Sequence, residues 1–390
     1  MEQIPKDLLL MMKDRVVMRI NTSIGKYDVV DDVIIPFPMQ RRIRKVPSFA
    51  EVKSKYDDTQ RQIAIDENKE TFIDWLAGRV LPLSRANAKK IYNLFGFAQL
   101  QDTYSRAKIA LVCRALSLQD NYWLKLEDDT VRWEDVNLRK VHLNEAIAQV
   151  SLRGTSLSIQ NKKEEAVKCP ELSGQGAYAK AWLREEDGLF LHKLGHNGVT
   201  ESKIEVMVSN ILDNCNVKHL KYEAASAFGI YTCRCKCMTD DNVSMLPGMD
   251  FDGYCNRRDV DPRAEALRID PEMIYKMMIV DYLIANPDRH GMNWGFFYNC
   301  DTMEILGCHP LYDHNNSFDI EYMRDPDVRY LYDERKSMRD WAKLAMTKVD
   351  FHFYQEPKRE DFHTERQFKT FMRRAKEIGV KCQESSVFGG

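Results

Sequence analysis

The sequence that decides the fold is Asn286-Pro287-Asp288-Arg289-His290-Gly291-Met292-Asn293-Trp294, followed by Pro310-Leu311-Tyr312-Asp313-His314-Asn315. The first stretch places an amide, Asn293, five residues after an acid, Asp288, and the second stretch supplies another acid, Asp313. In phosphoryl transfer an acid at this position orients the attacking hydroxyl group, while the amide and the second acid hold magnesium. The order therefore predicts a phosphotransfer site, with Asp288 for the hydroxyl group and with Asn293 and Asp313 for Mg²⁺.

The surroundings of Asp288 favour this interpretation over a chance spacing. An apolar helix is predicted directly before the loop, over residues 274–283, and the apolar residues 294–297 after it predict a strand that leads towards Asp313. Pro287 restricts the backbone conformation of the residue before it, Asn286. We expect His290 to brace the loop through hydrogen bonds.

Three upstream features supply the other parts that phosphoryl transfer needs. Gly174-x-Gly176 is expected in a turn between two strands, where glycine lets backbone amides approach a phosphate closely. Lys193 lies in an apolar predicted strand, residues 190–194, which would deliver it to the phosphates. Glu205 on the next predicted helix, residues 201–213, is expected to pair with that lysine, and Glu201 is the competing candidate.

Composition limits the class of protein. With 390 residues the chain predicts at least two domains. Charged residues are 30% and hydrophobic residues 44% of the chain, and the net charge is −2, which is typical of a globular protein rather than a generally basic nucleic-acid binder. No apolar run is long enough to cross a bilayer, and residues 1–6 lack a secretory signal, so we expect a cytoplasmic location.

The ten cysteines form no Cys-x-x-Cys pair, which favours reduced, buried thiols over a disulfide framework. Three of them alternate on one face of a predicted strand, where core packing is a better interpretation than a metal site: Cys233, Cys235 and Cys237.

The pattern along the chain predicts small strands and loops up to about residue 50, and then two or three helices over 66–116. We expect Ser84 to cap the helix that ends at Gly96. These helices suit packing units better than a helix-turn-helix DNA reader, and the basic cluster at 41–45 suits a solvated linker. The remaining predicted elements are two strands flanking a glycine-rich turn within 172–183, a strand at 188–194, strands near 221–224 and 229–238, and helices over 333–348 and 365–378, the last ending at Gly379.

Together these elements predict an α+β chain with the bilobal protein kinase-like fold, in which a small mixed β lobe precedes a helical lobe. We expect an N-terminal accessory module over 1–165, the kinase N-lobe over 166–238 and the kinase C-lobe over 239–390.

The motif Asn286-x-Asp288-Arg289-His290-x-x-Asn293-Trp294-Gly295 with Pro310-Leu311-Tyr312-Asp313 resembles the HipA-like serine/threonine kinases, which are bacterial relatives of the phosphatidylinositol kinases. The resemblance covers about residues 165–380. It implies an ATP- and Mg²⁺-dependent protein kinase with Asp288 as catalytic acid/base, assisted by Lys193 and His290, and with Asn293 and Asp313 as metal ligands. It further implies a nucleotide site built from Gly174, Gln175, Gly176, Ala177, Tyr178, Lys193 and Glu205.

The resemblance also implies a hinge over 234–238, with Lys236 and Met238, that holds adenine. Ser173 and Ser317 are the serines placed for regulatory autophosphorylation. The chain departs from the better-known HipA toxins in the residue order of 173–178 and in its N-terminal helices, which leaves toxin biology and the target open.

Several alternatives stay open from the sequence alone. One is a lipid or small-molecule kinase on the same fold, and another is a nucleotide-dependent regulator whose N-terminal helices bind DNA or protein. A metal hydrolase is a third and less favoured reading, built on His290, Cys308, His309 and His314. The expected partners are a protein substrate and a regulatory protein; nucleic acid has no support, and no membrane partner is expected.

Overall fold

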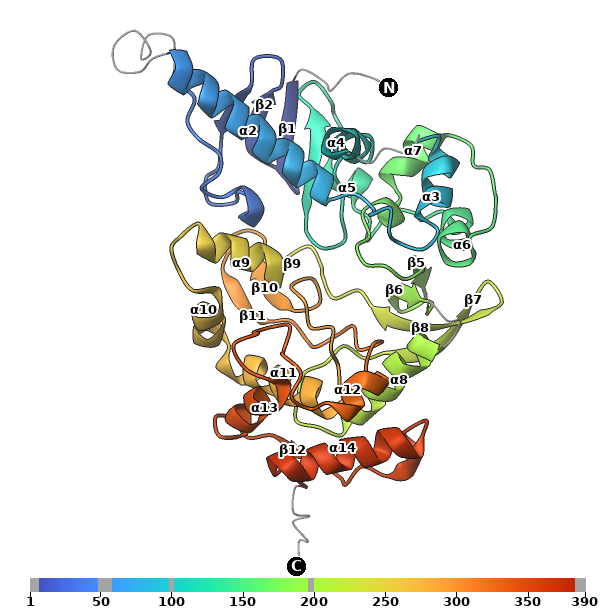
Figure 1. Cartoon of the computed structure of the whole chain (residues 1–390). Coiled ribbons are helices and arrows are strands. Elements are labelled where there is room, and N and C mark those ends of the chain that lie inside the picture. Colours follow the sequence, from blue (N-terminus) through green and yellow to red (C-terminus); the bar gives the residue numbers. More distant parts are fainter. Residues whose placement is uncertain (1–6, 48–57, 98–101, 196–199, 383–390) are drawn as a thin grey trace, which may run out of the picture. The chain divides into compact units, whose positions relative to one another are not determined.

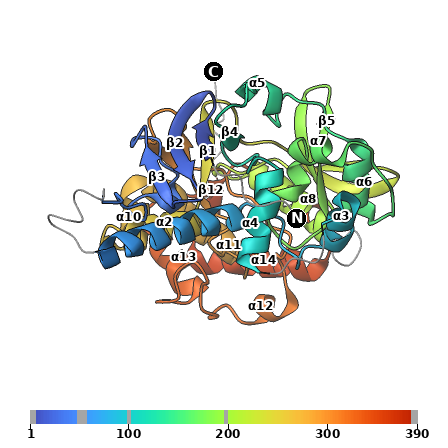
Figure 2. The ribbon, with the colours of Figure 1, turned by 90° about the horizontal axis from the view of Figure 1, so that it is seen from above.

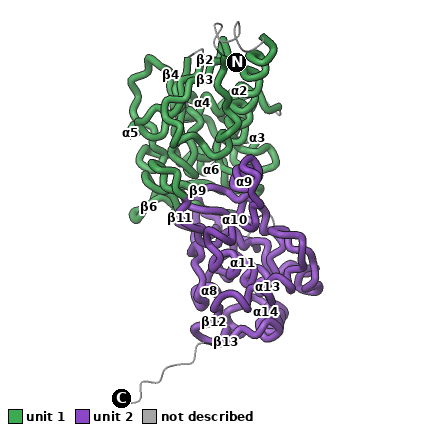
Figure 3. The backbone as a smooth tube through the Cα atoms, turned by 90° about the vertical axis from the view of Figure 1, so that its left-hand side faces the viewer, with its two compact units in different colours: residues 1–193, 237–245, 298–304 green, residues 194–236, 246–297, 305–390 purple. Residues whose placement is uncertain are grey.

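The computed structural model describes residues 7–47, 58–97, 102–195 and 200–382, and its internal contacts divide the chain into two units (Figure 3). Unit 1 comprises residues 1–193, 237–245 and 298–304, and unit 2 comprises residues 194–236, 246–297 and 305–390. The first six residues, on which the expectation about a secretory signal rests, lie outside the described part. Among the helices that are described, none combines the length and the apolar character that crossing a membrane requires.

Unit 1 begins with an antiparallel sheet whose central strand is buried on both faces. Its strands, in the order β3-β2-β1-β4, are β1 (Asp7–Met12), β2 (Arg15–Asn21), β3 (Lys26–Val29) and β4 (Tyr122–Leu126). Because side chains alternate along a strand, Leu8 and Leu10 of β1 enter one apolar cluster and Leu9 enters another. The second cluster also buries Trp123 and Trp133, so both rings are part of the core.

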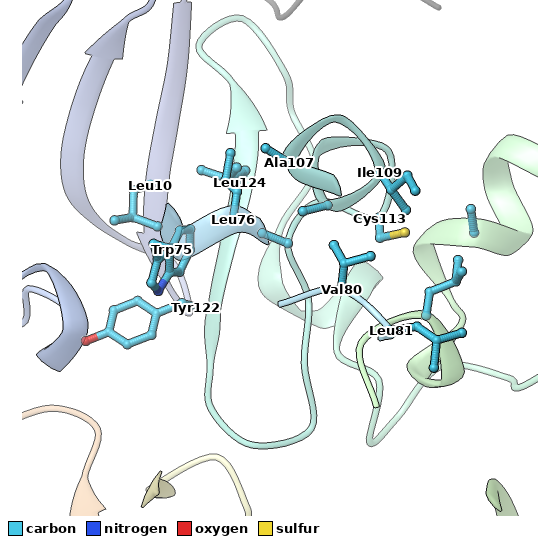
Figure 4. Close-up of a cluster of buried hydrophobic side chains, with 14 of the residues drawn as sticks. Leu10, Trp75, Leu76, Val80, Leu81, Ala107, Ile109, Cys113, Tyr122 and Leu124 are labelled. Atoms are coloured by element: carbon cyan, nitrogen blue, oxygen red, sulfur yellow. The ribbon is translucent and has the colours of Figure 1, made fainter. Parts of the chain in front are cut away.

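Helices cover this sheet and extend unit 1 (Figures 1 and 2). Trp75 and Leu76 of the long helix α2 pack with Leu10 and Leu124 of the sheet, and Ala107 of α4 joins the same cluster (Figure 4). The helices of unit 1 are α2 (Asp58–Gly78), α3 (Ala88–Phe95), α4 (Thr103–Val112), α5 (Trp133–Val136), α6 (Glu145–Arg153) and α7 (Lys162–Val167).

One local prediction for unit 1 is wrong. Ser84 does not cap α3: Asn87 occupies the N-cap in the left-handed conformation (φ 62°), which asparagine tolerates, whereas the expected end at Gly96 is confirmed. Within the segment predicted as small strands and loops, Pro36 precedes a short 3-10 helix, η1 (Phe37–Met39).

A second correction concerns the glycine-rich segment. The strand expected before it is absent, since Pro170 begins a 3-10 helix, η2 (Pro170–Leu172), and proline suits a helix start. Residues 173–179, here named the glycine loop, therefore connect η2 to β5 (Lys180–Glu185) instead of joining two strands. The strand expected after the glycine-rich turn is confirmed as β5, and the strand expected at 188–194 is confirmed as β6 (Gly188–Lys193). The two strands pair antiparallel, with Lys193 opposite Lys180.

Unit 2 is mainly helical. Helix α11 (Pro271–Leu283) is buried along ten of its residues, and α13 (Met338–Met346) and α14 (Glu365–Ile378) pack against it (Figure 1). The predicted helices before residue 286 and at the C-terminal end are confirmed, including the end of α14 at Gly379 (φ 76°). The other helices are α8 (Thr200–Asp213), α9 (Gly248–Asn256), α10 (Pro262–Ile269), α12 (Ile320–Arg324) and the 3-10 helix η3 (Arg359–Asp361).

The strands of unit 2 are short. The hairpin of β7 (Glu223–Ala227) and β8 (Ile230–Lys236) is antiparallel, and β12 (His352–Phe353) pairs in parallel with β13 (Lys381–Cys382). Strand β11 (Ile305–Cys308) also lies in unit 2, whereas β9 (Val243–Pro247) and β10 (Gly295–Asn299) are each divided between the units. The chain is therefore α+β, as predicted.

The structure also tests the predictions for the cysteines and for the basic cluster at 41–45. All ten cysteines are free thiols, and Cys233 and Cys235 are buried as expected. In the basic cluster, Arg42 and Arg44 form ion pairs with Asp74 and Glu67 of α2, which accords with a solvated face.

Candidate functional site

The Asp288 loop (residues 286–293) follows α11 and is fixed to it by a buried carboxylate. Asp281, in the last turn of α11, accepts hydrogen bonds from the Asn286 side chain (3.0 Å) and from two nitrogens of Arg289 (2.8 and 2.9 Å). Tyr330 donates its hydroxyl group to the same carboxylate. Asp281 and Arg289 are both fully buried, so this ion pair is shielded from solvent.

The electrostatics of this cluster keep its charges in place. Burial opposes the charged guanidinium, but the carboxylate of Asp281 and its hydrogen bonds outweigh this effect and raise the pKa of Arg289. Burial, reinforced by the charge of Asp281, raises the pKa of Tyr330 well above its ordinary value. Tyr330 is therefore a permanent donor to Asp281 near neutral pH.

Arg289 also joins the Asp288 loop to the Asp313 segment (residues 310–317). Its Nη1 donates to the carbonyl groups of Asn293 (2.7 Å) and Tyr312 (2.9 Å), and its Nη2 lies 3.4 Å from His314 Nδ1. The Tyr312 hydroxyl group donates to the carbonyl of Met292 (2.8 Å). One buried side chain thus sets the spacing of the two segments that carry the predicted acids.

Asp288 has one side-chain hydrogen bond and a histidine ring close to its other oxygen. Its side chain is 35% exposed, and Oδ2 accepts a hydrogen bond from Asn316 Nδ2 (2.8 Å). The ring of His290 accepts the backbone N–H of Met292 at Nδ1 (3.1 Å), which places the proton of the neutral ring on Nε2. That nitrogen lies 3.7 Å from Asp288 Oδ1, so His290 presents an N–H to the acid.

Asn293 is oriented for a ligand. Its Nδ2 donates to the backbone carbonyl of Asp288, which fixes the amide plane. Its Oδ1 is buried and has no hydrogen-bond donor among the described residues. The residue as a whole is only 1% exposed. An uncompensated buried amide oxygen is costly unless something binds it, and a hard cation prefers such an oxygen. The oxygen therefore fits the predicted magnesium ligand.

Asp313 takes the left-handed backbone conformation (φ 62°), which strains a non-glycine residue and turns the chain sharply. Among the described residues no group of three or more His, Cys, Asp or Glu side chains could hold a metal ion. The two predicted ligands, Asn293 and Asp313, are a smaller protein ligand set, and magnesium sites with so few protein ligands share the ion with nucleotide phosphates.

Glu205 supports the Asp313 segment directly. It is fully buried on α8, and its Oε1 accepts the backbone N–H of His314 (2.7 Å). Glu201, the competing candidate, is only half-buried. Lys193 is buried at the end of β6 in unit 1, whereas Glu205 lies in unit 2, so their pairing stays a prediction.

The remaining predicted residues are distributed over both units. The glycine loop with Gly174, Gln175, Gly176, Ala177 and Tyr178 lies in unit 1, Lys236 is exposed at the end of β8 in unit 2, and Met238 is half-buried in unit 1. Both serines are buried: Ser173 is 8% exposed and donates to the Pro170 carbonyl (3.1 Å), and Ser317 is 2% exposed. Phosphorylation of either serine therefore requires its segment to move.

The histidines that favoured a metal hydrolase are engaged otherwise. His309 lies between the rings of Phe297 and Tyr312, and its Nδ1 lies 3.1 Å from the Pro310 carbonyl, to which it donates. Burial lowers the pKa of His309 to about 4, so the ring is neutral. His314 faces the guanidinium of Arg289, which is no neighbour for a metal ion.

The sequence analysis did not identify three residues that support the site: Asp281, Asn316 and Tyr330. Asp281 had a signal, because a lone acid within the apolar run Met277-Met278-Ile279-Val280-Asp281-Tyr282-Leu283 needs a buried partner. Asn316 and Tyr330 had none, since their roles depend on how distant segments meet.

No protein-family model matches the chain, and no curated protein matches its sequence. Among solved structures, the chain is similar to the Helicobacter pylori proinflammatory kinase CtkA, with 14% identity, coverage of 52% of this chain and 92% of that chain, and a TM-score of 0.39. It is also similar to a chain of the Shewanella oneidensis MR-1 toxin–antitoxin complex of HipA, HipB and operator DNA, with 11% identity, coverage of 96% and 98%, and a TM-score of 0.49.

Proposed function

We propose that this chain is an ATP- and Mg²⁺-dependent protein kinase of the HipA-like type that phosphorylates serine or threonine. The observation that carries the proposal is the Asn293 amide: its nitrogen is anchored on the Asp288 backbone, and its buried oxygen is left for a ligand. A structural asparagine would normally use both ends of its amide. The bilobal arrangement and the domain limits at 165 and 238 belong to this proposal.

Each residue has a role that follows from its chemistry. Asp288, kept in place by Asn316 and His290, would accept or orient the proton of the substrate hydroxyl group. Asn293 and Asp313 would hold magnesium, which when bound neutralises charge on the phosphate oxygens. Lys193 would bind the nucleotide phosphates, with Glu205 orienting both it and the Asp313 segment.

The nucleotide would lie under the glycine loop, with adenine at the hinge near Lys236 and Met238. Glycine at 176 has φ +93°, a conformation that other residues rarely adopt, so the loop is built for close backbone approach there. Ser173 or Ser317 would be the regulatory phosphorylation sites.

The test is phosphotransfer by the full chain. Purified protein is incubated with ATP and Mg²⁺, with and without dephosphorylated casein as a general acceptor, and mass spectrometry locates any phosphate. Asp288→Asn and Asp313→Asn are each expected to reduce transfer by about 10³-fold or more, because each removes a charge on which positioning depends.

The matched control is Asp259→Asn. Asp259 is an exposed acid of the same unit in the left-handed conformation (φ 59°), which asparagine tolerates, so this variant should keep full activity. Transfer that persists in both site variants would refute the assignment. Label that passes only to an inositol lipid or a metabolite would favour the lipid or small-molecule kinase instead.

A further inference from the structure

We propose that the N-terminal module positions the glycine loop for phosphate binding, with Arg85 as the positioning residue. This inference rests on the proposed function, because it assumes that the loop covers a nucleotide. Every contact that carries it lies within unit 1. It assigns a role in nucleotide binding to a module for which the sequence indicated none.

Arg85 spans the two ends of the loop. It lies in the connection between α2 and α3 and is 3% exposed. Its Nη1 lies 3.4 Å from the carbonyl oxygen of Gly174, and its Nη2 donates to the carbonyl oxygen of Lys180. Ser151 of α6 accepts from the same Nη2 (3.1 Å) and donates to the Lys180 carbonyl (2.5 Å). One guanidinium thus fixes the start and the end of the segment that would cover the phosphates.

Other groups of the same connection, residues 78–86, hold the rest of the loop. The Leu81 N–H donates to the Leu172 carbonyl (2.7 Å), and the Ala86 N–H donates to the Ala177 carbonyl (2.8 Å). The Gln175 side chain donates to the carbonyl of Gly78 (3.0 Å). The connection therefore contacts the loop at its beginning, middle and end.

These contacts determine which backbone groups the loop can offer. A phosphate is bound by N–H groups and repelled by carbonyl oxygens. The carbonyl groups at positions 172, 174, 177 and 180 all accept hydrogen bonds from the module, the last of them from both Arg85 and Ser151. The module thus withdraws carbonyl oxygens from the ligand and leaves the exposed residues Gly176 and Ala177 in a fixed conformation.

Glycine at position 174 is explained by this contact. A Cβ there would lie 2.5 Å from Arg85 Nη1, closer than real Cβ atoms come, and the backbone of Gly174 is not in the left-handed region. Glycine is therefore needed at position 174 to leave room for the guanidinium, whereas at position 176 it is needed for its backbone conformation. Gly174→Ala should displace Arg85 without straining the backbone of the loop.

The charge of Arg85 acts in the same direction as its geometry. Burial lowers the pKa of Arg85 to about 10, with Glu171 opposing the shift, so the guanidinium stays charged at neutral pH. A buried positive charge behind the loop favours an anion in front of it. Arg85→Lys keeps this charge but cannot donate to both ends of the loop, and it therefore separates the two contributions.

The experiment compares Arg85→Gln, Arg85→Lys and Arg106→Gln in the full chain. Arg106 is the matched control, because it donates to the Val80 carbonyl (3.1 Å) of the same connection and not to a carbonyl of the glycine loop. Gln175 donates to the same Val80 carbonyl (3.3 Å), so this oxygen keeps a donor in the control variant. The affinity for a fluorescent ATP analogue is measured by titration, and hydrogen exchange of residues 173–179 is measured without nucleotide. Thermal unfolding of each variant verifies that it is folded.

Arg85→Gln is expected to weaken binding of the analogue about tenfold and to speed hydrogen exchange in the loop, and Arg106→Gln should change neither. Arg85→Lys should also speed exchange while retaining part of the affinity. In Arg85→Gln/Gly174→Ala the losses of affinity should not add, because both changes remove the same contact.

Two failures are distinguishable. If the unaltered protein binds no ATP analogue, the proposed function fails. If it binds the analogue and Arg85→Gln leaves both affinity and loop exchange unchanged, the positioning role of Arg85 is wrong while the kinase proposal stands.

Discussion

The Asp288 loop and the glycine loop are each fixed by a buried arginine, but the two arginines have different partners. Arg289 pairs with a carboxylate eight residues upstream, and the charge of Asp281 raises its pKa despite burial. Arg85 bonds carbonyl oxygens 89 and 95 residues away, and burial lowers its pKa to about 10. The ion pair of the first loop lies within a short stretch of chain, whereas the arginine of the second loop lies 89 and 95 residues upstream of its two carbonyl partners.

This difference explains what could be predicted from the sequence. The Asp288 loop, the helix before it and the strand after it were predicted because their patterns are local. The buried acid Asp281 was missed, although a lone acid in an apolar helix is a local signal. The glycine loop was misplaced between two strands because Pro170 and the contacts from residues 78–86 decide its path. Sequence periodicity carries no information on hydrogen bonds that span nearly a hundred residues.

The largest expected effect comes from separating the buried pair of the Asp288 loop. Arg289→Met leaves the carboxylate of Asp281 buried without its cation, and should lower the free energy of unfolding by about 3–5 kcal/mol. Urea denaturation measures this loss. In Arg289→Met/Asp281→Leu no bare charge remains, so the loss should be smaller than the sum of the two single losses; simple additivity would contradict an ion pair.

The next effect concerns pH and His309. The pKa of His309 is about 4 in the folded protein, whereas an exposed histidine of the unfolded chain has the ordinary pKa of 6.5. Between these pH values the unfolded chain therefore binds a proton that the folded chain does not. Stability should therefore fall as the pH drops from about 6.5 towards 4, by about 3 kcal/mol from this group. His309→Phe, which keeps a ring between Phe297 and Tyr312, should flatten this part of the profile.

The control for this titration is His363→Gln, because His363 is exposed. Urea denaturation at pH 4.5, 5.5 and 7 should give the control the slope of the unaltered protein. An unchanged slope in His309→Phe would mean that other groups cause the acid sensitivity.

Arg85→Met allows the stability contributed by the two buried arginines to be compared directly. It removes donors from two carbonyl oxygens, and Ser151 still donates to the Lys180 carbonyl. The buried carboxylate of Glu171 loses a nearby cation but keeps the hydrogen bond from the Trp182 N–H (2.9 Å). We expect a loss of about 1–3 kcal/mol, less than for Arg289→Met. Urea denaturation of both variants under one set of conditions tests the order, and a larger loss for Arg85→Met would show that the glycine loop has the more costly support.

The smallest effect tests whether the Asp288 loop is also tuned by a contact that its local sequence does not contain. Asn316 donates to Asp288 Oδ2 (2.8 Å) from the Asp313 segment, 28 residues away. Asn316→Leu keeps the size of the side chain but loses this donor, so kcat should fall about tenfold, equivalent to about 1.4 kcal/mol, while KM for ATP stays within about twofold. Asn256→Leu, at an exposed asparagine of the same unit, should leave both constants unchanged. A rise in KM that matches the fall in kcat would instead place Asn316 in nucleotide binding. The Asp288 loop would then be set by its short-range ion pair, and the distant contact from Asn316 would not tune it.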